Sequence, residues 1–335
     1  MKKKRYALPF LLLLCTLTAC GRISKPVQST LDFFAMDTVM TFSAYADKSL
    51  LEGARDIVMG IESRASTTLE SSEVYALNRD GGGTVSEETA ALLDTALTMC
   101  RATVGAFDVS IYPVVRAWGF TTGEYRVPSF DETAALLEHV DYARIRLDGQ
   151  SVTLPEGMEI DLGGVAKGYA GREAASYLRE HGVTSGLLNL GGNVQTVGSK
   201  PDGSPWRVAI RDPDDAQSYA GVVEIRDKAA VTSGGYERYF EENGETYWHI
   251  MNPATGRPAR NGVVSATVIA DDGALCDALS TALFVMGPEK AERFWRSYGG
   301  FDMILITDDG ETIVTPGLAY TPTDSAPYTL KTLEE

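Results

Sequence analysis

Apolar positions recur along this chain at two different spacings, which predicts a mixture of β-strands and α-helices. Residues 38–46 (TVMTFSAYA) alternate between apolar and polar side chains, as a half-buried strand does. Residues 49–62 and 274–286 instead repeat their apolar side chains every three or four positions, as an amphipathic helix does. Asp-Gly pairs at 148–149 and 309–310 mark tight hairpin turns. Because such hairpins outnumber clear strand–helix–strand units, the pattern predicts an α+β fold.

Capping residues and glycines set the expected ends of two further helices. One opens at Ser86, a typical N-cap followed by two glutamates, and runs to Gly105. The other runs from about Gly168 to His181 and closes at Gly182. The chain shows no repeat, low-complexity run or linker between residues 31 and 320, which predicts a single folded unit. The expected organisation is a signal peptide (1–19), a lipidated cysteine and tether (20–30), one domain (31–320) and a C-terminal tail (321–335).

The N-terminus has the features of a bacterial export signal, which is set aside before the fold is considered. Basic residues 2–5 precede an apolar segment, 7–19, that is too short for a stable membrane span. Residues 17–20 (LTAC) resemble the lipobox of bacterial lipoproteins, which implies cleavage before Cys20 and attachment of lipid to that cysteine. An ordinary secretory peptide with an incidental cysteine is the alternative. We expect a protein that lies outside the cytoplasm, anchored to the cell membrane by lipid.

Net charge limits the classes of ligand. The formal charge is −16, and loss of the four basic residues of the signal peptide makes it −20. A chain this acidic is a poor candidate for binding the phosphate backbone, so no nucleic-acid partner is expected. An anionic small ligand would need local help from a helix N-terminus, a lysine or a bound cation. Cys100 and Cys276 stand among apolar residues of helical segments and are predicted to be buried free thiols.

The familiar signatures of phosphate-binding loops, dinucleotide-binding turns and nucleophile elbows are absent, and no two of the three histidines have zinc-site spacing. The segment DLGGVAKGYA (161–170) is the first remaining candidate. Gly163 and Gly164 permit a turn that exposes backbone groups, and Lys167 lies near the start of a helix, where an anion is favoured. The segment could hold a diphosphate, a cation through a backbone carbonyl, or both. A glycine turn with a surface ion pair between Asp161 and Lys167 is an equally good interpretation.

Asp277 and Thr281 form a second candidate site. They are four residues apart in a predicted helix and therefore share one of its faces. A carboxylate and a hydroxyl on one face, with water, suit a hard cation such as Mg²⁺. The same face borders an apolar stripe, where a carboxylate without a partner is costly to bury. Taken alone, this segment favours the simpler interpretation that Asp277 caps a neighbouring loop and Thr281 hydrogen-bonds within its own helix.

Two further segments carry polar groups next to aromatic ones. His249 stands between a predicted strand and a tight Asn-Pro loop, where functional residues concentrate. It could accept a proton from a hydroxyl nucleophile, although a lone histidine is usually structural. Residues 105–120 (GAFDVSIYPVVRAWGF) combine flat rings with polar neighbours. That combination suits a planar heterocycle and equally suits an ordinary core.

Seven motifs in a fixed order resemble the ApbE family, the FAD:protein FMN transferases. They extend from about Phe33 to Gly317, nearly the whole mature chain, and the lipoprotein start also suits the family. The matching segments are MDTVM, GAFDVSIYPVVRAWGF, DLGGVAKGYAGREA, LLNLGGNVQTVG, AVTSGGYERYF, YWHIMNPATGRP and CDALSTALFVMG. The resemblance implies a single ApbE-like, T-fold-like unit in which mixed and antiparallel sheets are packed by helices.

The resemblance also implies a reaction. FAD would bind with its diphosphate near Mg²⁺, FMN would pass to a Thr or Ser hydroxyl of a partner flavoprotein outside the cytoplasm, and AMP would leave. Mg²⁺ would be held by Asp277, Thr281 and the carbonyl of Gly164. Catalysis would depend on Asp277 and on His249 as the base. The FAD site would be lined by Met36, Tyr75, Ala106, Phe107, Asp108, Asp161, Lys167 and Ile250.

Two other functions remain open at this point. An Mg²⁺-dependent FAD pyrophosphatase, in which water replaces the protein hydroxyl, would use the same geometry. A lipoprotein that stores or delivers FAD without chemistry belongs to another class, and the intact pair of Asp277 and Thr281 argues against it. The chain departs from the family at Asp37, where glycine is common, and at Cys276, where alanine is common. Neither departure removes a proposed ligand.

Overall fold

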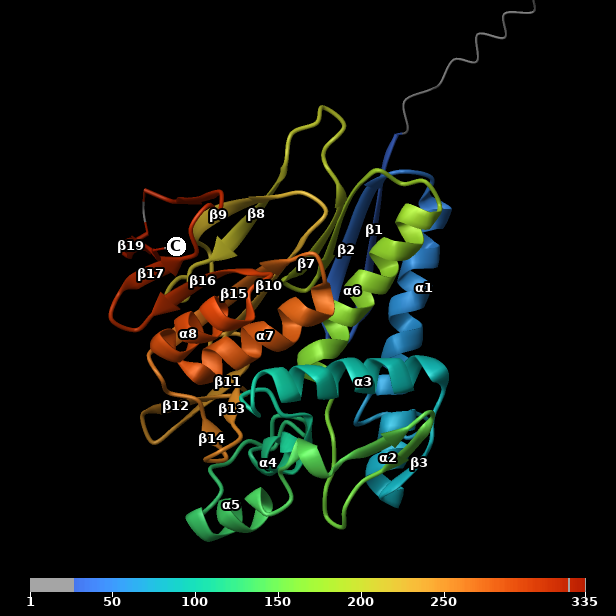
Figure 1. The fold of residues 1–335 in the computed structure, drawn as a ribbon, viewed down its shortest axis with the longest axis vertical. Helices are drawn as coiled ribbons and strands as arrows, with labels where there is room; N and C mark the ends of the chain where they lie inside the picture. The colour runs from blue at the N-terminus through green and yellow to red at the C-terminus, as the bar shows by residue number, and fades with distance from the viewer. Residues whose placement is uncertain (1–26, 325, 335) are drawn as a thin grey trace, which may run out of the picture.

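A nine-stranded sheet forms the centre of the fold in the computed structural model (Figure 1). The structure describes residues 27–324 and 326–334, so the predicted signal peptide and Cys20 lie outside the described residues. In spatial order the strands are β1 (Gln28–Ala35), β2 (Thr38–Tyr45), β6 (Ser185–Leu190), β7 (Asn193–Gly198), β10 (Ala229–Gly234), β15 (Val263–Ala270), β16 (Asp302–Thr307), β17 (Glu311–Val314) and β19 (Thr329–Thr332). Neighbouring strands are antiparallel except β17 and β19, which are parallel.

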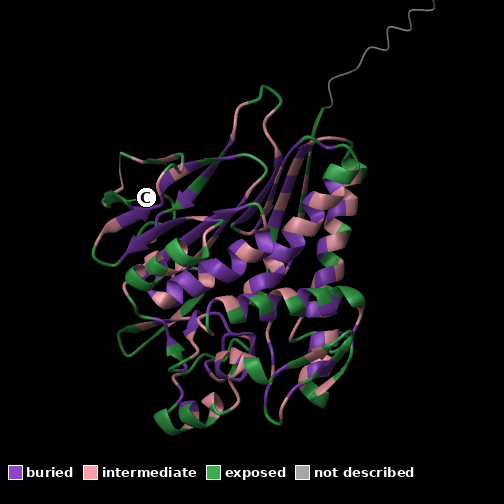
Figure 2. Cartoon of the chain, in the orientation of Figure 1, coloured by how far each residue is buried: buried purple, intermediate pink, exposed green. Residues whose placement is uncertain are grey.

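Helices cover one face of this sheet (Figure 1). They are α1 (Lys48–Ala65), α6 (Gly163–Glu180) and α7 (Gly273–Met286), with α3 (Glu87–Ala102) packed against all three and α8 (Pro288–Tyr298) beside α7. Helix α7 is almost wholly buried, as Figure 2 shows, which explains why its sequence is so apolar. Among the described residues, no helix is both long enough and apolar enough to cross a membrane.

A small sheet covers the other face of the central strands. It consists of β8 (Trp206–Arg211), β9 (Tyr219–Ile225) and β18 (Tyr320–Pro322). Strict alternation in β8 turns Val208 and Ile210 inward, where they meet Ile269 and Ile304 of the large sheet in a second hydrophobic core. The middle of the large sheet is therefore buried on both faces, so β15 reads as a nearly continuous apolar run rather than an alternating one.

The remaining elements gather at one end of the helical layer (Figure 1). They are α2 (Glu73–Asp80), β3 (Gly82–Thr84), the 3₁₀ turn η1 (Val109–Ile111), α4 (Tyr112–Ala117), α5 (Phe130–Leu137), the 3₁₀ turn η2 (Tyr142–Arg144), β4 (Arg146–Asp148), β5 (Ser151–Thr153), β11 (Tyr239–Glu242), β12 (Glu245–Trp248), β13 (Met251–Asn252) and β14 (Arg257–Pro258). A third, smaller core around Trp118, Phe120 and Tyr247 packs the β11–β12 hairpin against the α4 region. Trp118 and Phe120 are thus ordinary core residues, as the simpler interpretation of their segment had it.

The predicted α+β class is confirmed, but two helix ends were predicted wrongly. Helix α6 begins at Gly163, five residues before the predicted start. Neither Gly163 nor Gly164 has a positive φ, and the Asp161 side chain accepts the Gly163 N–H at 2.7 Å, so the glycines belong to the helix and not to a turn. Helix α3 ends at Ala102, before the predicted stop at Gly105. The predicted buried free thiols at Cys100 and Cys276 are confirmed.

Segments near both ends of the chain form strands in places where the sequence predicted a tether and a tail. Strand β1 begins at Gln28, inside the segment predicted as a tether. The predicted tail (321–335) contributes β19, which pairs with β17 at the edge of the large sheet. All four residues of β19 are exposed, so it carries no apolar alternation that a sequence pattern could reveal. Backbone hydrogen bonding alone marks it as a strand.

Asp37 lies in a turn that favours glycine. Ala35 pairs with Thr38, so Met36 and Asp37 form a two-residue connection between β1 and β2. Their φ angles are 49° and 60°, which is the left-handed region at both positions, as in a type I′ turn. Glycine adopts this region without a Cβ clash, whereas aspartate tolerates it at a cost.

We therefore expect Asp37→Gly to raise the free energy of unfolding by about 1 kcal/mol. Urea-induced unfolding of both proteins measures the change. Asp37→Ala is the matched control and should lower stability, because alanine has the Cβ atom without the short polar side chain that makes aspartate tolerable. Equal stability of the glycine and alanine variants would contradict this account of the turn.

Candidate active site

Helices α6 and α7 cross so closely that their backbones touch at Gly168 and Gly273. A Cβ atom on Gly168 would overlap the carbonyl oxygen of Gly273 and lie 2.7 Å from Cβ of Asp277. A Cβ atom on Gly273 would lie 2.6 Å from the carbonyl oxygen of Gly168. Such distances leave no room for a side chain at either position, so the crossing depends on glycine in both helices.

This crossing brings Asp277 to the first turns of α6. Asp277 is 5% exposed, and its Oδ2 atom accepts a hydrogen bond of 2.8 Å from the N–H of Gly168. In a regular helix that N–H would donate to the carbonyl of Gly164, four residues earlier. The Asp277 carboxylate is therefore bonded one helical turn from Gly164, another of the three predicted metal ligands. One carboxylate oxygen of Asp277, Oδ2, thus bonds a neighbouring segment, as the simpler interpretation expected.

Thr281, the third predicted ligand, lies one turn further along α7 on the same face as Asp277. Its hydroxyl lies 3.2 Å from the Ser233 hydroxyl at the end of β10. Ser233 also contacts the hydroxyl of Ser280 at 2.8 Å. The hydroxyl of Thr281 is thus directed across to β10, so the interpretation that it bonds within its own helix does not describe this side chain.

The donor chemistry at this point fits Mg²⁺. A carboxylate, a hydroxyl and a backbone carbonyl are all hard oxygen donors, and sulfur or nitrogen is not among them. Across the described residues, no group of three or more His, Cys, Asp and Glu side chains gathers as a metal cage. Mg²⁺ commonly uses one or two carboxylates and fills its other positions with water and substrate phosphate oxygens. A single carboxylate is therefore compatible with such a site.

The segment that precedes α6 is joined to the segment that follows α3. The Asp161 N–H donates to the carbonyl of Val109 at 2.8 Å. The ring of Phe107 lies over the start of α6, because a Cβ atom on Gly164 would be 2.9 Å from it. Ala106, beside it, is half-buried. The structure thus brings Ala106 and Phe107 to Asp161 and to the turn of α6 that carries Gly164.

Asp108 does not present its carboxylate to this site. The side chain is buried, and its Oδ1 accepts hydrogen bonds from the N–H and hydroxyl of Ser110 at 2.8 and 2.6 Å. Its Oδ2 accepts the Tyr142 N–H at 3.3 Å. These bonds fix the η1 turn behind Phe107, so Asp108 supports the wall of the site from inside the protein.

Tyr75 and Met36 approach from two other elements. Asn78 on α2 clasps the backbone of Ile160 with two hydrogen bonds of 2.8 Å, directly before Asp161. Tyr75 stands three residues earlier on the same face of α2 and is half-buried. The Met36 N–H donates to Glu62 on α1 at 2.7 Å, which holds the β1–β2 turn beside the helical layer.

His249 is held at the base of the β11–β12 hairpin. Its backbone N–H donates to the Arg238 carbonyl at 3.0 Å, and its Nδ1 lies 3.2 Å from the same oxygen. A carbonyl oxygen only accepts, so Nδ1 carries the hydrogen and Nε2 keeps a free lone pair. The Phe120 ring meets the imidazole edge to face, with centroids 6.3 Å apart. Ile250 follows as a buried residue whose carbonyl accepts the Ala259 N–H at 2.9 Å.

Charged groups in this region act on one another's pKa values. Asp277 is buried, Asp161, Lys167 and His249 are half-buried, and Arg238 is exposed. The pKa of His249 is lowered to about 3, chiefly by burial; the positive charges of Arg238 and Lys167 contribute to the fall, and the hydrogen bond to the Arg238 carbonyl opposes it. Burial raises the pKa of Asp161, and the Gly163 amide, Arg238 and Lys167 oppose that rise. Burial likewise raises the pKa of Asp277, opposed by Lys167, the Gly168 amide and Asn193. Perturbed acids and bases that share the same cations are typical of functional sites.

The structure adds residues that the sequence analysis did not single out. Glu237 has a pKa raised by burial, with Lys167 and Arg211 opposing and Asp277 adding to the rise. Ser233, Arg238 and Asn193 contact predicted site residues. All four lie in the segments LLNLGGNVQTVG and AVTSGGYERYF, which matched the family pattern. Position within those motifs was the available signal, but neither periodicity nor spacing distinguished these residues from their neighbours.

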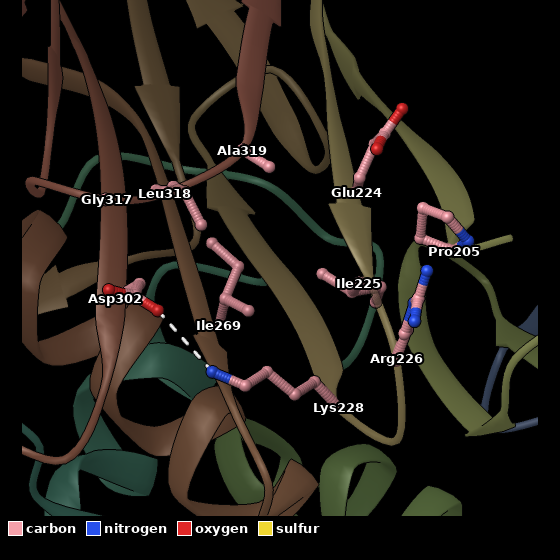
Figure 3. Close-up of a pocket in the computed structure, with 10 residues that line it drawn as sticks. All are labelled: Pro205, Glu224, Ile225, Arg226, Lys228, Ile269, Asp302, Gly317, Leu318 and Ala319. Carbon is pink, nitrogen blue, oxygen red and sulfur yellow. Dashed lines mark ion pairs between the residues drawn. The ribbon is translucent and has the colours of Figure 1, made fainter.

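A cavity of about 410 Å³ lies elsewhere in the molecule, between the small sheet and the large one (Figure 3). Its walls include Arg226 and Lys228, and Lys228 pairs with Asp302 at 3.6 Å. None of the predicted site residues lines it. A smaller space beside Lys167, Gly168 and Gly273 adjoins the predicted site. We place the candidate site by its converging chemistry, since the larger cavity gathers none of the predicted site residues.

Known proteins of similar sequence and structure point the same way. A family model described as "ApbE family" matches residues 36–305. The chain is 31% identical over 332 residues to a FAD:protein FMN transferase of Treponema pallidum, covering 91% of this chain and 92% of that protein. It is 34% identical over 276 residues to one of Vibrio cholerae, covering 79% and 82%. The crystal structure of the ApbE protein of Thermotoga maritima superposes with a TM-score of 0.80 at 31% identity, covering 89% of this chain and 98% of that one.

The crossing at Gly168 predicts an unusually costly glycine-to-alanine change. Gly168→Ala should lower the free energy of unfolding by about 3 kcal/mol, because the added methyl group meets backbone that cannot move aside. Gly60→Ala is the control. Gly60 also lies inside a helix, but the nearest atoms to a Cβ there belong to the flexible Arg64 side chain at 3.5 Å or more. That change should stabilise by about 0.5–1 kcal/mol. Urea unfolding that ranks both variants alike would refute the proposed contact.

The environment of His249 predicts its titration. The imidazole should stay neutral from pH 7 down to about 4 in the ligand-free protein, as NMR chemical shifts of the ring would report. The unfolded chain binds this proton near pH 6.5 and the folded protein only near 3, so acidification through that window lowers the free energy of unfolding. His249→Gln should remove this part of the pH dependence. A ring that titrates near pH 6.5 in the folded protein would show that the site is well hydrated.

Proposed function

The chain belongs to the ApbE family, and we propose that it is an Mg²⁺-dependent enzyme that transfers FMN from FAD to a Thr or Ser hydroxyl of a partner flavoprotein, releasing AMP. Flavin transfer is the activity named for its relatives in Treponema pallidum and Vibrio cholerae. The observation that carries the proposal for this chain is the meeting of Asp277 and the Gly164 turn at the α6–α7 crossing.

Three oxygen donors would hold the cation: the Asp277 carboxylate, the Thr281 hydroxyl and the Gly164 carbonyl. The hydrogen bond from the Gly168 N–H to Asp277 supports this set, because it places the carboxylate one helical turn from the Gly164 carbonyl. When bound, Mg²⁺ would neutralise charge on the diphosphate and polarise the phosphorus that is attacked.

Lys167 supplies a positive charge that no described acid neutralises by direct pairing. The ion pairs within the described residues do not include it. Its ammonium acts on Asp277, Glu237 and His249 over a longer range. A diphosphate placed between these groups would find both Lys167 and Arg238 in position to stabilise the charge that develops as the bond between the phosphates breaks.

His249 is suited to remove the proton of the acceptor hydroxyl. Its Nδ1 hydrogen is directed to the Arg238 carbonyl, so Nε2 is the atom that would accept the proton. The oxygen of the acceptor forms a bond to the FMN phosphorus, the bridging P–O bond breaks, and AMP leaves with the electron pair. The anionic diphosphate would offset the two cations that lower the pKa of His249 and so strengthen it as a base.

The flavin would bind against the remaining predicted residues. Phe107 offers an aromatic ring beside Gly164, and Tyr75 and Ala106 border the same segment. Asp161 keeps one oxygen on the Gly163 N–H and has its other oxygen available for a polar edge of the nucleotide. Met36 and Ile250 would contribute apolar contacts at the margins of the site.

We also propose that the mature protein is lipidated at Cys20 and works outside the cytoplasm. The support is the basic and apolar order of residues 2–19 and the LTAC sequence at 17–20, whose cysteine would begin the mature chain. The acceptor would then be another extracytoplasmic flavoprotein, since the chain carries no evident flavin-accepting module of its own.

The decisive experiment incubates the protein with FAD and Mg²⁺, with and without a candidate acceptor. AMP release is followed by chromatography, and FMN on an acceptor hydroxyl residue is sought by mass spectrometry. Asp277→Ala should reduce metal-dependent AMP release by at least 100-fold. Asp271→Ala is the control, because Asp271 is exposed at the start of the same helix and should leave the rate unchanged.

Each outcome separates the candidate functions. AMP release that requires the acceptor, with FMN found on it, supports the transferase. AMP release without any acceptor, and no FMN on protein, would identify a pyrophosphatase. No AMP under either condition would leave only a carrier of FAD. Full activity in Asp277→Ala would move the metal away from the α6–α7 crossing.

A further inference from the structure

We propose that Asn193 is a positioning residue of the metal site, whose side-chain amide donates a hydrogen bond to the Asp277 carboxylate and holds it in the orientation that binds the cation. The inference rests on the proposed function, because it presumes that Asp277 is a metal ligand. Asn193 is the first residue of β7 and follows the two-residue turn Gly191-Gly192, whose φ angles of 68° and 104° require glycine. Pairing of Leu190 with Asn193 then fixes its backbone.

The amide of Asn193 is a buried donor with nothing to satisfy it. The residue is 5% exposed, and its Nδ2 atom makes no hydrogen bond of good geometry to any described group. A buried amide left in this state costs about 1–3 kcal/mol. Water does not relieve it, because the space it shares with Lys167, Gly168 and Gly273 is too small for a water molecule. The Nδ2 atom of Asn193 therefore needs a hydrogen-bond acceptor among the residues of the candidate site.

Asp277 is the charged group that this donor faces. Asn193 lines the same small space as Gly168, whose N–H holds Asp277, and its amide is one of the groups that oppose the rise in the Asp277 pKa. One carboxylate oxygen, Oδ2, already accepts the Gly168 N–H. A second donor on the carboxylate would fix its rotation about the Cβ–Cγ bond. Groups that orient a metal-ligating carboxylate commonly change metal affinity by 10- to 100-fold when they are removed.

Gln195 is as deeply buried as Asn193, but its side chain has different neighbours. It stands two residues further along β7, on the same face, is 3% exposed, and has an Oε1 atom without a partner. Its side chain lies against the Gly168–Gly273 crossing, where a Cβ atom on Gly273 would be 2.9 Å from Oε1. Its Nε2 donates to the Thr196 carbonyl at 3.4 Å, and it is not among the groups that oppose the rise in the Asp277 pKa. Gln195 is thus a matched control: equally buried, also with one unpaired atom, but not directed at the proposed ligand.

The test measures binding of Mn²⁺, a spectroscopic probe for the Mg²⁺ site, to the full protein without nucleotide. Electron paramagnetic resonance of free Mn²⁺ reports the dissociation constant. Asn193→Leu keeps the approximate volume and removes the donor, and we expect it to weaken Mn²⁺ binding by about tenfold or more. Its stability without metal should stay the same or increase, because an unpaired buried donor is gone. Gln195→Met should bind Mn²⁺ as the wild type does.

A kinetic readout separates positioning from general damage. In Asn193→Leu the metal concentration that gives half-maximal AMP release should rise about tenfold, while the rate at saturating metal stays close to that of the wild type. Unchanged Mn²⁺ affinity in Asn193→Leu would overturn the inference, as would an equal loss in Gln195→Met. Weaker FAD binding without metal, at unchanged Mn²⁺ affinity, would also overturn it by assigning the amide to the dinucleotide.

Asp277→Ala distinguishes failure of this inference from failure of the proposed function. If that variant loses Mn²⁺ binding and Asn193→Leu does not, the metal site stands and Asn193 has no part in it. If Asp277→Ala binds Mn²⁺ as tightly as the wild type, the metal lies elsewhere and both proposals fall.

Discussion

The backbone contact between α6 and α7 at Gly168 and Gly273 is the constraint on which the site depends. There the N–H of one helix reaches a carboxylate on another, and that bond joins Gly168 to Asp277 at 2.8 Å. The contact also explains how a carboxylate is tolerated in α7, where eleven of fourteen residues are buried. A carboxylate within such an apolar helix needs a donor, and the neighbouring backbone provides one without a second charged residue.

The partial burial of the charged groups around this contact shapes the chemistry of the site. Acids gain raised pKa values and His249 a lowered one, while Lys167 and Arg238 act on several of these groups at once. An anionic ligand bound together with a cation would stabilise the charges of these acids and of Lys167 and Arg238 better than water does. Such an arrangement would suit the phosphoryl chemistry proposed for this site.

Three hydrophobic cores together hold the elements that carry this site. The large core fixes α6 and α7 on the sheet, and the core beneath the small sheet closes the opposite face. The third core, around Trp118 and Tyr247, holds the hairpin that ends at His249. His249 lies where two of these cores meet, because Ile250 belongs to the large core and Tyr247 to the third.

By itself the sequence determined the α+β class, the main helices of the layer on the sheet, several strands, and the identity of the chemical groups. Capping at Ser86, the Asp-Gly turns and the apolar spacing of α7 are local signals, because they depend on residues within a few positions of one another. Seven ordered motifs then indicated the family, which the comparisons established. Local signals failed at the start of α6, where two glycines suggested a turn, and at β19, whose pairing leaves no apolar pattern.

Only the tertiary structure decided which of these groups act together. Gly168 and Asp277 are 109 residues apart, and nothing near either one indicates that the amide of the first is bonded to the carboxylate of the second. The same holds for Asn193, whose sequence surroundings are those of any strand after a glycine turn, and for Asp108, whose carboxylate is directed inward by Ser110 and Tyr142. Hydrogen bonds of this kind depend on distances across the fold, and those distances are set by the packing of the whole chain.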